Sequence, residues 1–372
     1  MTKDLAFLPA WYAEKEDYVF VDDGETPDAT FLSDLPETIR PSALPLTRND
    51  LVKNAAILPH MEVRPWGISR PVICLFNELK QSYGLPLDLP LWKQEYSRLT
   101  NRRTAAECLD MLREILPDTP LPPTPRFFSE IEEIETFMQR HSGNFVLKAP
   151  YSSSGRGLLW TNGNRLNDNE RKRIGKILRT QGAISMEQVA DKIQDFAMEY
   201  HSDGKGNIRY EGLSLFHTTP QGAYKGNTLQ TQSALREKLQ TYVGKETTEP
   251  IRQAVTQALV QTFATRYTGY IGVDMLLYKG KEAFDIHPCI EINLRYTMGL
   301  AALRIFANYL EANATGVLNI LYEKETKRAY ERHRQLKKTY PIVHKNGKLS
   351  KGYLSLCPVR EHTQFVAYIL AT

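Results

Sequence analysis

The stretch CIEINLR, residues 289–295, alternates polar and apolar side chains in the manner of a β-strand. Because alternate residues of a strand share a face, Glu291, Asn293 and Arg295 are predicted to point the same way. A carboxylate, an amide and a guanidinium therefore gather on one face of a strand whose intervening positions are apolar.

A second apolar run, IGVDMLL at residues 271–277, carries Asp274. Gly280, between the two runs, allows a turn that would place them side by side as a hairpin. An ionised carboxylate among apolar neighbours is costly unless a positive charge balances it. Two carboxylates and an amide oxygen on adjacent strands are ligands of the kind that Mg²⁺ takes, together with waters and substrate phosphates. The alternative is that Arg295 simply neutralises Glu291.

A second constellation lies upstream, in FVLKAPYSSSGRGLLW at residues 145–160, which predicts a strand, a loop of small residues and another strand. Lys148 closes the first strand, where its stem can be buried while its ammonium group reaches a charged partner. The loop offers successive backbone N–H groups, hydroxyls and glycines for close approach of phosphate oxygens. It is not a Walker A loop, because no Gly-Lys-Ser/Thr follows. The alternative is an ordinary hairpin turn.

In this order, the two constellations resemble the ATP-grasp superfamily over about residues 101–298. The resemblance implies an α/β (α+β) architecture with the ATP-grasp fold in three parts. Residues 1–100 would form an N-terminal pre-ATP-grasp α/β domain, and residues 101–185 a linker helix and a small lid subdomain. Residues 186–372 would form a C-terminal antiparallel-sheet subdomain with the metal site.

The resemblance also implies a nucleotide-binding set. Arg102 stands at the start of an Ala/Leu-rich helix, as does the family's first phosphate-binding basic residue, and Arg103 is the alternative. Residues 186–189 resemble the hinge whose backbone reads the adenine edge, and Asp195 lies where the family places a ribose contact. The implied contacts are Arg102, Lys148, Ser153, Ser154, Gly155, Arg156, Gly157, Glu187, Val189 and Asp195.

Asp274, Glu291 and Asn293 match the family's metal ligands, so the resemblance implies Mg²⁺ or Mn²⁺ bound together with ATP. Arg295 matches an active-site arginine of the carboxylase-like members. Lys225, in a Gly-flanked loop, lies where ATP-grasp enzymes bring substrate contacts, and could stabilise a transferring phosphoryl group or an acyl phosphate. The alternative for Lys225 is an exposed lysine at a hairpin tip.

The function implied by the resemblance is an ADP-forming, ATP- and Mg²⁺-dependent carboxylate–amine ligase. Such an enzyme activates a carboxylate as an acyl phosphate, which an amine or related nucleophile then attacks. Asp274 follows the pattern of the D-alanine–D-alanine ligase-like members, whereas the carboxylase-like members use Glu, so the subfamily stays open. The alternatives are a nucleotide-binding regulatory protein with little turnover and an ATP-grasp small-molecule kinase.

The composition is ordinary for a globular protein of 372 residues, and the small-molecule carboxylate and amine substrates are implied by the resemblance alone. The net charge of +4 does not indicate nucleic acid as a partner. No signal peptide is recognisable and no apolar run is long enough to span a bilayer, so no membrane association is expected. The scattered cysteines predict reduced thiols and a cytoplasmic location. A homodimer is considered because dimers are common in the family.

Further elements are expected along the chain. A helix over residues 70–83 should stop at Gly84, and another helix should span residues 101–116. Ser129 is expected to cap a helix over residues 129–141. Trp66 could contact a ligand, but packing in the core is the preferred interpretation. The other helices are expected at residues 169–179, where a solvated lid helix is preferred to a nucleic-acid face, and at 250–267, 299–310 and 324–338.

Overall fold

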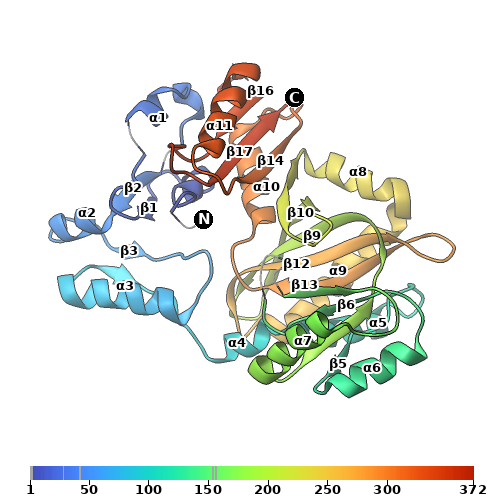
Figure 1. Cartoon of the computed structure of the whole chain (residues 1–372). Coiled ribbons are helices and arrows are strands. Elements are labelled where there is room, and N and C mark those ends of the chain that lie inside the picture. The colour runs from blue at the N-terminus through green and yellow to red at the C-terminus, as the bar shows by residue number, and fades with distance from the viewer. Residues whose placement is uncertain (1–2, 28, 42, 153–154, 156) are drawn as a thin grey trace. The chain divides into compact units, whose positions relative to one another are not determined.

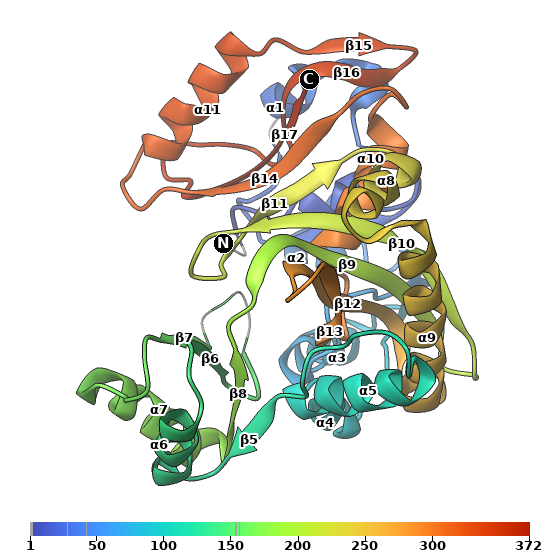
Figure 2. The ribbon, with the colours of Figure 1, turned by 90° about the vertical axis from the view of Figure 1, so that its right-hand side faces the viewer.

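The computed structural model describes residues 3–27, 29–41, 43–152, 155 and 157–372. The chain forms two compact units. The first comprises Met1–Trp92, Lys225–Leu235 and Tyr296–Thr372, and the second comprises Lys93–Tyr224 and Arg236–Arg295. Helices and strands occur in both units (Figures 1 and 2), so the mixed α/β class is confirmed. The division into domains at residues 1–100, 101–185 and 186–372 stays a prediction.

The second unit contains four long antiparallel strands in the order β13-β12-β9-β10. The predicted hairpin is confirmed, with Asp274 opposite Glu291 and Gly272 opposite Asn293. Helix α5 packs on β13 and on α9, which also packs on β10. The elements are α5 (Arg102–Ile115), β9 (Asp191–Asp203), β10 (Ile208–Thr218), α9 (Lys245–Phe263), β12 (Thr268–Lys279) and β13 (Phe284–Asn293).

The same unit holds a smaller sheet with strands in the order β5-β8-β6-β7. Its helices bury Ile134, Met138 and Ile174 against Phe145 and Leu147 of β6, which gives this sheet a hydrophobic core of its own. The elements are β5 (Arg126–Phe128), α6 (Ile131–Arg140), β6 (Phe145–Lys148), β7 (Leu158–Thr161), α7 (Asp168–Gln181) and β8 (Ile184–Gln188). The remaining helices are α4 (Glu95–Leu99) and α8 (Gln232–Val243), which runs across the unit boundary.

The first unit is built from both ends of the described chain. Trp11 is fully buried, and its indole N–H donates to the carbonyl oxygen of Leu356 at 2.6 Å. Its sheet has the order β11-β14-β17-β16-β15. The strands are β11 (Tyr224–Leu229), β14 (Gly316–Tyr322), β15 (Val343–Lys345), β16 (Lys348–Ser355) and β17 (Phe365–Ala371).

Helices α10 and α11 pack on this sheet, and the N-terminal segment adds two parallel two-stranded pairs, β1 with β2 and β3 with β4. The helices are η1 (Leu8–Trp11), α1 (Ala29–Ser33), η2 (Glu37–Ile39), α2 (Arg48–Lys53), α3 (Arg70–Tyr83), α10 (Met298–Tyr309) and α11 (Arg328–Thr339). The short strands are β1 (Tyr18–Val21), β2 (Leu44–Thr47), β3 (Met61–Glu62) and β4 (Leu87–Asp88).

Helix boundaries follow the sequence signals in most cases. Helix α3 ends where expected, at Gly84, whose φ of +64° terminates the helix. The predicted Ser129 cap is wrong, because Glu130 is the N-cap residue and no side chain accepts there. Helix α9 begins at Lys245 and contains Pro250, which was expected to be its first residue.

Trp66 lies at the surface of the first unit, with 37% of its area exposed, so the preferred core interpretation is wrong. Its ring lies 5.5 Å from that of Tyr296 and 6.3 Å from that of Tyr12, measured between centroids. Among the helices of the described residues, none is long and apolar enough to cross a membrane.

Candidate active site

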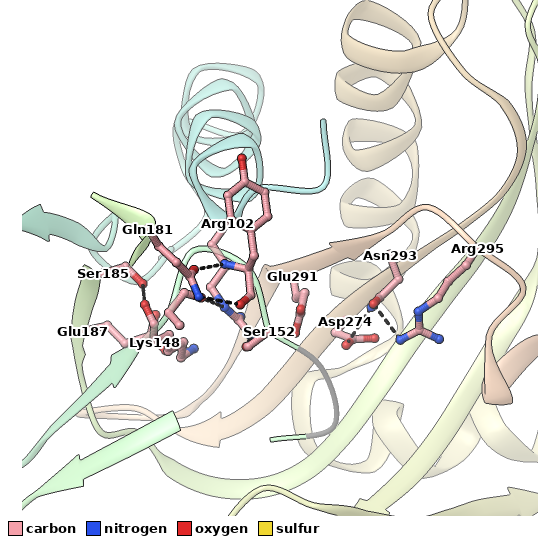
Figure 3. Close-up of polar contacts among 12 residues, drawn as sticks. Arg102, Lys148, Ser152, Gln181, Ser185, Glu187, Asp274, Glu291, Asn293 and Arg295 are labelled. Carbon is pink, nitrogen blue, oxygen red and sulfur yellow. Dashed lines mark hydrogen bonds and ion pairs between the residues drawn. The ribbon is translucent and has the colours of Figure 1, made fainter. Parts of the chain in front are cut away.

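Arg102 joins three parts of the second unit that are far apart in the sequence. Its Nε donates to the carbonyl oxygen of Ala149 at 3.1 Å, and its Nη2 donates to Ser152 Oγ at 3.2 Å. The same Nη2 lies 3.1 Å from Glu291 Oε2, and the Arg102 side chain is only 8% exposed (Figure 3). One buried guanidinium therefore links the start of α5, the loop after β6 and strand β13.

Arg103 takes a different position. Asn101 Oδ1 accepts the backbone N–H of Arg103 and so caps α5, while the exposed Arg103 guanidinium stacks over the Phe127 ring at 4.3 Å. Of the two candidate arginines, Arg102 is the one that contacts the loop and Glu291. Asn101 thus sets the start of the helix so that the second arginine faces outward and the first inward.

Lys148 and Glu187 form a buried ion pair between neighbouring strands β6 and β8 (Figure 3). Ser185 is the cross-strand partner of Lys148, and its hydroxyl donates to the Lys148 carbonyl at 3.2 Å. Burial opposes ionisation of Glu187 most strongly, yet the Lys148 ammonium, with His287 and Arg102, holds the pKa of this carboxyl below its ordinary value. Glu187 therefore stays ionised despite its burial.

The loop after Lys148 is closed at its base. Ala149 donates its N–H to Gly157 O at 3.0 Å, and a Cβ on Gly157 would lie 2.3 Å from Ser152 Cβ, so only glycine fits there. Tyr151 is held by Gln181, whose side chain accepts the Tyr151 N–H at 2.9 Å and donates to the Tyr151 carbonyl at 3.2 Å. Three of the predicted phosphate contacts, Ser153, Ser154 and Arg156, lie outside the described residues.

The tip of this loop meets a hairpin turn between β10 and β11. Both Gly155 and Gly222 have positive φ, at +73° and +86°. A Cβ on Gly155 would lie 2.7 Å from Gly222 O, and a Cβ on Gly222 would lie 2.6 Å from Leu158 Cδ1. Gly155 therefore needs a hydrogen atom where it meets backbone, whereas at Gly222 only the tip of the flexible Leu158 side chain is in the way and the positive φ is what favours glycine.

Hydrogen bonds link two of the predicted metal ligands, Asp274 and Asn293, whereas the third, Glu291, stands opposite Asp274 and pairs with Arg102. Asn293 Nδ2 donates to Asp274 Oδ2 at 3.1 Å, and Arg295 Nη2 donates to Asn293 Oδ1 at 2.9 Å (Figure 3). Burial, Glu291 and Glu199 together raise the pKa of Asp274 to about 8. The side chains of Asp274, Glu291 and Asn293 all offer oxygen atoms to a ligand. A divalent cation bound among them would favour the ionised form of Asp274, which the neighbouring acids disfavour.

Within the described part of the chain, no group of three or more His, Cys, Asp and Glu side chains could hold a metal ion. The candidate set consists of two carboxylates and an amide. Such a set suits Mg²⁺, which is bound in proteins through few protein ligands and completed by waters and phosphates.

Glu199 is a buried acid that the sequence analysis missed. It is only 2% exposed, and on β9 it stands opposite Gly272 on one side and Gly212 on the other. Ser214 Oγ donates to Glu199 Oε1 at 3.1 Å. Because Gly272 is also the partner of Asn293, Glu199 belongs to the row of residues that faces the candidate metal ligands. A lone acid in a run that is buried on both faces gave no signal in the sequence.

The hinge region and Asp195 are already engaged within the protein. Val189 donates its N–H to the Asn144 carbonyl at 2.9 Å, whereas the N–H of the next residue, Ala190, has no acceptor among the described residues. Asp195 Oδ2 accepts from Lys192 Nζ at 2.8 Å and from Thr218 Oγ1 at 2.7 Å. A ligand that reads the hinge backbone would thus meet Ala190 before Val189.

Lys225 lies on β11, with an exposed side chain, and belongs to the first unit. Arg295 is the last residue of the second unit, and Tyr296 begins the next segment of the first. The other described candidates, from Arg102 to Arg295, are all in the second unit.

Solved structures resemble this chain over its length. N5-carboxyaminoimidazole synthetase from Staphylococcus aureus, complexed with ADP, is 14% identical with a TM-score of 0.52, covering 100% of this chain and 91% of the other. Biotin carboxylase from Campylobacter jejuni, in a β,γ-ATP complex, is 11% identical with a TM-score of 0.55, covering 99% and 85%. The chain has the ATP-grasp fold.

A third similar structure is the biotin carboxylase domain dimer of 2-oxoglutarate carboxylase from Hydrogenobacter thermophilus, in complex with MgADP, ADP and bicarbonate. It is 13% identical with a TM-score of 0.50, and covers 87% of this chain and 73% of the other. No protein-family model matches the sequence, and no curated protein matches it either. The resemblance to these structures is therefore found at 11–14% identity, where comparison with family models and curated proteins gives no match.

The contact between Gly155 and Gly222 predicts that alanine at Gly155 weakens nucleotide binding more than alanine at a glycine with open space around it. Gly155→Ala places a Cβ against backbone that cannot rotate away, so the loop must move, and we expect ADP affinity to fall about 10-fold through loss of loop N–H contacts to phosphate. Isothermal titration with Mg²⁺ and ADP measures this.

Gly163→Ala is the matched control, because φ is +84° but nothing lies within 4 Å of the new Cβ. Both variants should lose about 1–2 kcal/mol of stability from the strained backbone. Equal ADP affinity in the two variants would contradict the proposed importance of the contact.

The raised pKa of Asp274 predicts a pH-dependent stability. Between pH 4 and 8 the folded protein keeps a proton on Asp274 that the unfolded chain releases, so stability falls as pH rises through that window. In the presence of EDTA, as pH rises from 4 to 8, we expect Tm to drop by about 5–10 °C more in the wild type than in Asp274→Asn, for which this titration is absent. Parallel Tm profiles of the two proteins would refute the assignment.

Proposed function

We propose that the protein is an ATP- and Mg²⁺-dependent, ADP-forming ligase. It would activate a carboxylate as an acyl phosphate and join the acyl group to an amine or a related nucleophile. The observation that carries the proposal is the Arg102–Glu291 ion pair, which brings the phosphate-side residues and the acidic strand together within one unit. The ATP and ADP complexes of similar structures support it.

In this proposal, Arg102 and Lys148 offset the charge of the ATP phosphates, together with the loop N–H groups between Ser152 and Leu158. Both cationic side chains already form ion pairs with carboxylates, Arg102 with Glu291 and Lys148 with Glu187. They are therefore charged and in place before a phosphate group binds. The adenine edge would be read by the hinge backbone from Glu187 onward, with the N–H of Ala190 available as a donor.

Asp274, Glu291 and Asn293 would hold Mg²⁺, or Mn²⁺, through their oxygens. When bound, the cation supplies positive charge to the phosphates of ATP. Without it, Asp274 shares a buried face with Glu291 and Glu199 and is pushed toward its neutral form. Asn293 keeps its orientation because its amide donates to Asp274 and its carbonyl accepts from Arg295.

The acceptor side of the reaction is assigned to Arg295 and Lys225. Arg295, fixed through Asn293, would orient an acceptor carboxylate or stabilise developing negative charge. Lys225 would stabilise the transferring phosphoryl group. Asp195, which Lys192 and Thr218 hold in place, would accept a ribose hydroxyl. The phosphate-covering loop would exclude water and so protect an acyl phosphate from hydrolysis.

Small molecules are the proposed substrates, with no nucleic acid and no membrane involved. Cys74, Cys108, Cys289 and Cys357 are free thiols, which supports the proposed cytoplasmic location. A homodimer is a further proposal, since the similar biotin carboxylase domain from Hydrogenobacter thermophilus is described as a dimer.

Glu291→Gln tests the site directly, because it keeps the shape of the side chain and removes the charge shared by Arg102 and the cation. We expect ADP formation with Mg²⁺ to fall by at least about 100-fold, since a metal ligand and a phosphate-side anchor are lost together. A coupled assay for ADP measures it. Glu249→Gln is the matched control, as Glu249 also pairs with an arginine, Arg252, on the helix α9 of the same unit. Full activity in Glu291→Gln would overturn the metal assignment.

The products distinguish the proposed ligase from its alternatives. A panel of carboxylic acids, bicarbonate included, is incubated with amines and ATP, and the carboxylate oxygens carry an isotopic label. A ligase transfers labelled oxygen to inorganic phosphate, because that oxygen leaves with the phosphoryl group. A small-molecule kinase yields a stable phosphorylated product without free phosphate, and a regulatory protein binds ATP without forming ADP.

A further inference from the structure

The segment that runs through α11 and the β15–β16 hairpin carries a large excess of positive charge. Residues 324–351 contain ten lysines and arginines and only two acidic residues, whereas the whole chain has a net charge of +4. Some of these cations are paired within the unit, as Lys337 is with Asp34. Five others are exposed and have no carboxylate within 4 Å among the residues that the structure describes, and we call them the basic surface: Arg332, Arg334, Lys338, Lys345 and Lys351.

This concentration of charge is unfavourable within the chain itself. Arg334 and Lys338 lie four residues apart on α11, so their like charges share one side of the helix. Lys345 and Lys348 are direct partners on β15 and β16, where like charges also repel each other. Because β15 is the outer strand of its sheet (Figure 2), its lysines discourage the addition of another strand. A partner would therefore meet these side chains and not the strand backbone, and negative charge on it would relieve the repulsion.

Two exposed apolar residues, Tyr340 and Val343, lie among these cations. Tyr340 follows α11, and its carbonyl oxygen accepts the N–H of Tyr353 on β16 at 2.9 Å. Val343 is 51% exposed and is the direct cross-strand partner of Lys351. This face therefore combines exposed apolar side chains with surrounding charge, as protein–protein interfaces do.

The opposite charge gathers near the N-terminus of the same unit. Residues 14–25 contain six acidic residues and one lysine. Arg64 acts electrostatically on two of these acids but forms its ion pair with Glu62. Five of the six acids are exposed and have no cationic group within 4 Å in the described part of the chain, and we call them the acidic surface: Glu14, Glu16, Asp17, Asp22 and Asp23.

The acidic surface also has exposed apolar neighbours. Tyr18 and Leu44 are direct partners on β1 and β2, and the Leu44 N–H donates to the Asp17 carbonyl at 3.2 Å. Leu44 is 60% exposed, and Tyr18 is exposed as well. Each of the two surfaces thus contains an exposed tyrosine and an exposed aliphatic side chain among charges of one sign, and the two signs are opposite.

We propose that the basic surface of one copy of this chain docks on the acidic surface of a second copy. Because both surfaces belong to the same unit, a two-fold axis would form this contact twice in one dimer. A second copy is favoured over a nucleic acid because the chain itself supplies the complementary negative surface. The inference rests on the homodimer proposed above and not on the proposed reaction.

Sedimentation velocity of the full chain at several salt concentrations tests the proposal. The dissociation constant of the dimer should rise at least about 10-fold between about 0.05 and 0.5 M NaCl, because salt screens exposed charges. The variant Lys338→Glu/Lys345→Glu/Lys351→Glu, called the lysine variant, has two acidic surfaces. Alone, it should associate at least about 10-fold more weakly than the wild type.

The variant Glu14→Lys/Glu16→Lys/Asp22→Lys, called the acid variant, has two basic surfaces and should be weakened to the same extent. An equimolar mixture of the lysine variant and the acid variant should form a heterodimer. One contact is then that of the wild type, and the other has its signs exchanged. All six positions are exposed, so thermal unfolding should show that both variants keep the wild-type fold.

The matched control is Lys172→Glu/Lys176→Glu/Arg179→Glu, which makes the same change of charge on exposed positions of α7 in the second unit. This variant should dimerise with the affinity of the wild type. Its result separates an effect of the docking surface from an effect of net charge.

Four results would overturn the proposal. A wild type that is monomeric at every salt concentration excludes the homodimer, and a dimer insensitive to salt and to both variants has its interface elsewhere. Absence of a heterodimer in the mixture excludes charge complementarity between the two surfaces. Binding of an RNA oligonucleotide or of anionic vesicles by a monomer, if the lysine variant loses it, assigns the basic surface to another partner. The coupled assay for ADP tests the proposed ligase reaction separately.

Discussion

The buried guanidinium of Arg102 is the constraint on which the candidate site depends. Arginine stays charged under all physiological conditions and presents its donors in a rigid planar fork. Here the fork is satisfied by the Ala149 carbonyl, the Ser152 hydroxyl and the Glu291 carboxylate. Since an unpaired buried charge costs several kcal/mol, the loop and the acidic strand must stay where they meet it. The start of α5, which carries Arg102, therefore determines where the loop and the acidic strand meet.

Charge balance shapes the rest of this region. Glu199, Asp274 and Glu291 share one face of the sheet. Two arginines contact residues of this face: Arg102 pairs with Glu291, and Arg295 donates to Asn293. The arginines do not compensate the acids fully, because the pKa of Asp274 remains raised to about 8. Lys148 and Glu187 form a separate ion pair between β6 and β8. The excess negative charge is therefore confined to the positions at which a cation would bind.

Local features of this fold were predictable from the sequence, and long-range ones were not. The strand pair that carries Asp274 and Glu291 followed from side-chain alternation and a glycine turn, both of which are local. The contact of Arg102 with Glu291 spans 189 residues of sequence. Its existence depends on the packing of α5 against β13, which periodicity does not determine.

Other features were missed for reasons that can be named. Glu199 lies in a strand buried on both faces, so alternation gave no contrast. The register irregularity after Asp274 places His287 opposite Leu276, and such irregularities leave no clear trace in sequence. Helix α9 starts at Lys245 although Pro250 lies inside it, where the proline cannot donate to the carbonyl of Glu246, so the rule that places a proline at the first helical position gave the wrong start.

The first unit combines segments that are far apart in the sequence, and this affects the order in which its parts can fold during synthesis on the ribosome. Trp11 is buried against the carbonyl of Leu356, a partner 345 residues later in the chain. The core around Trp11 also needs residues of β14, β16 and β17, so the N-terminal segment emerges long before its packing partners exist. The second unit, which ends at Arg295, can become compact first. Until β14, β16 and β17 have been synthesised, the apolar residues around Trp11 lack these packing partners.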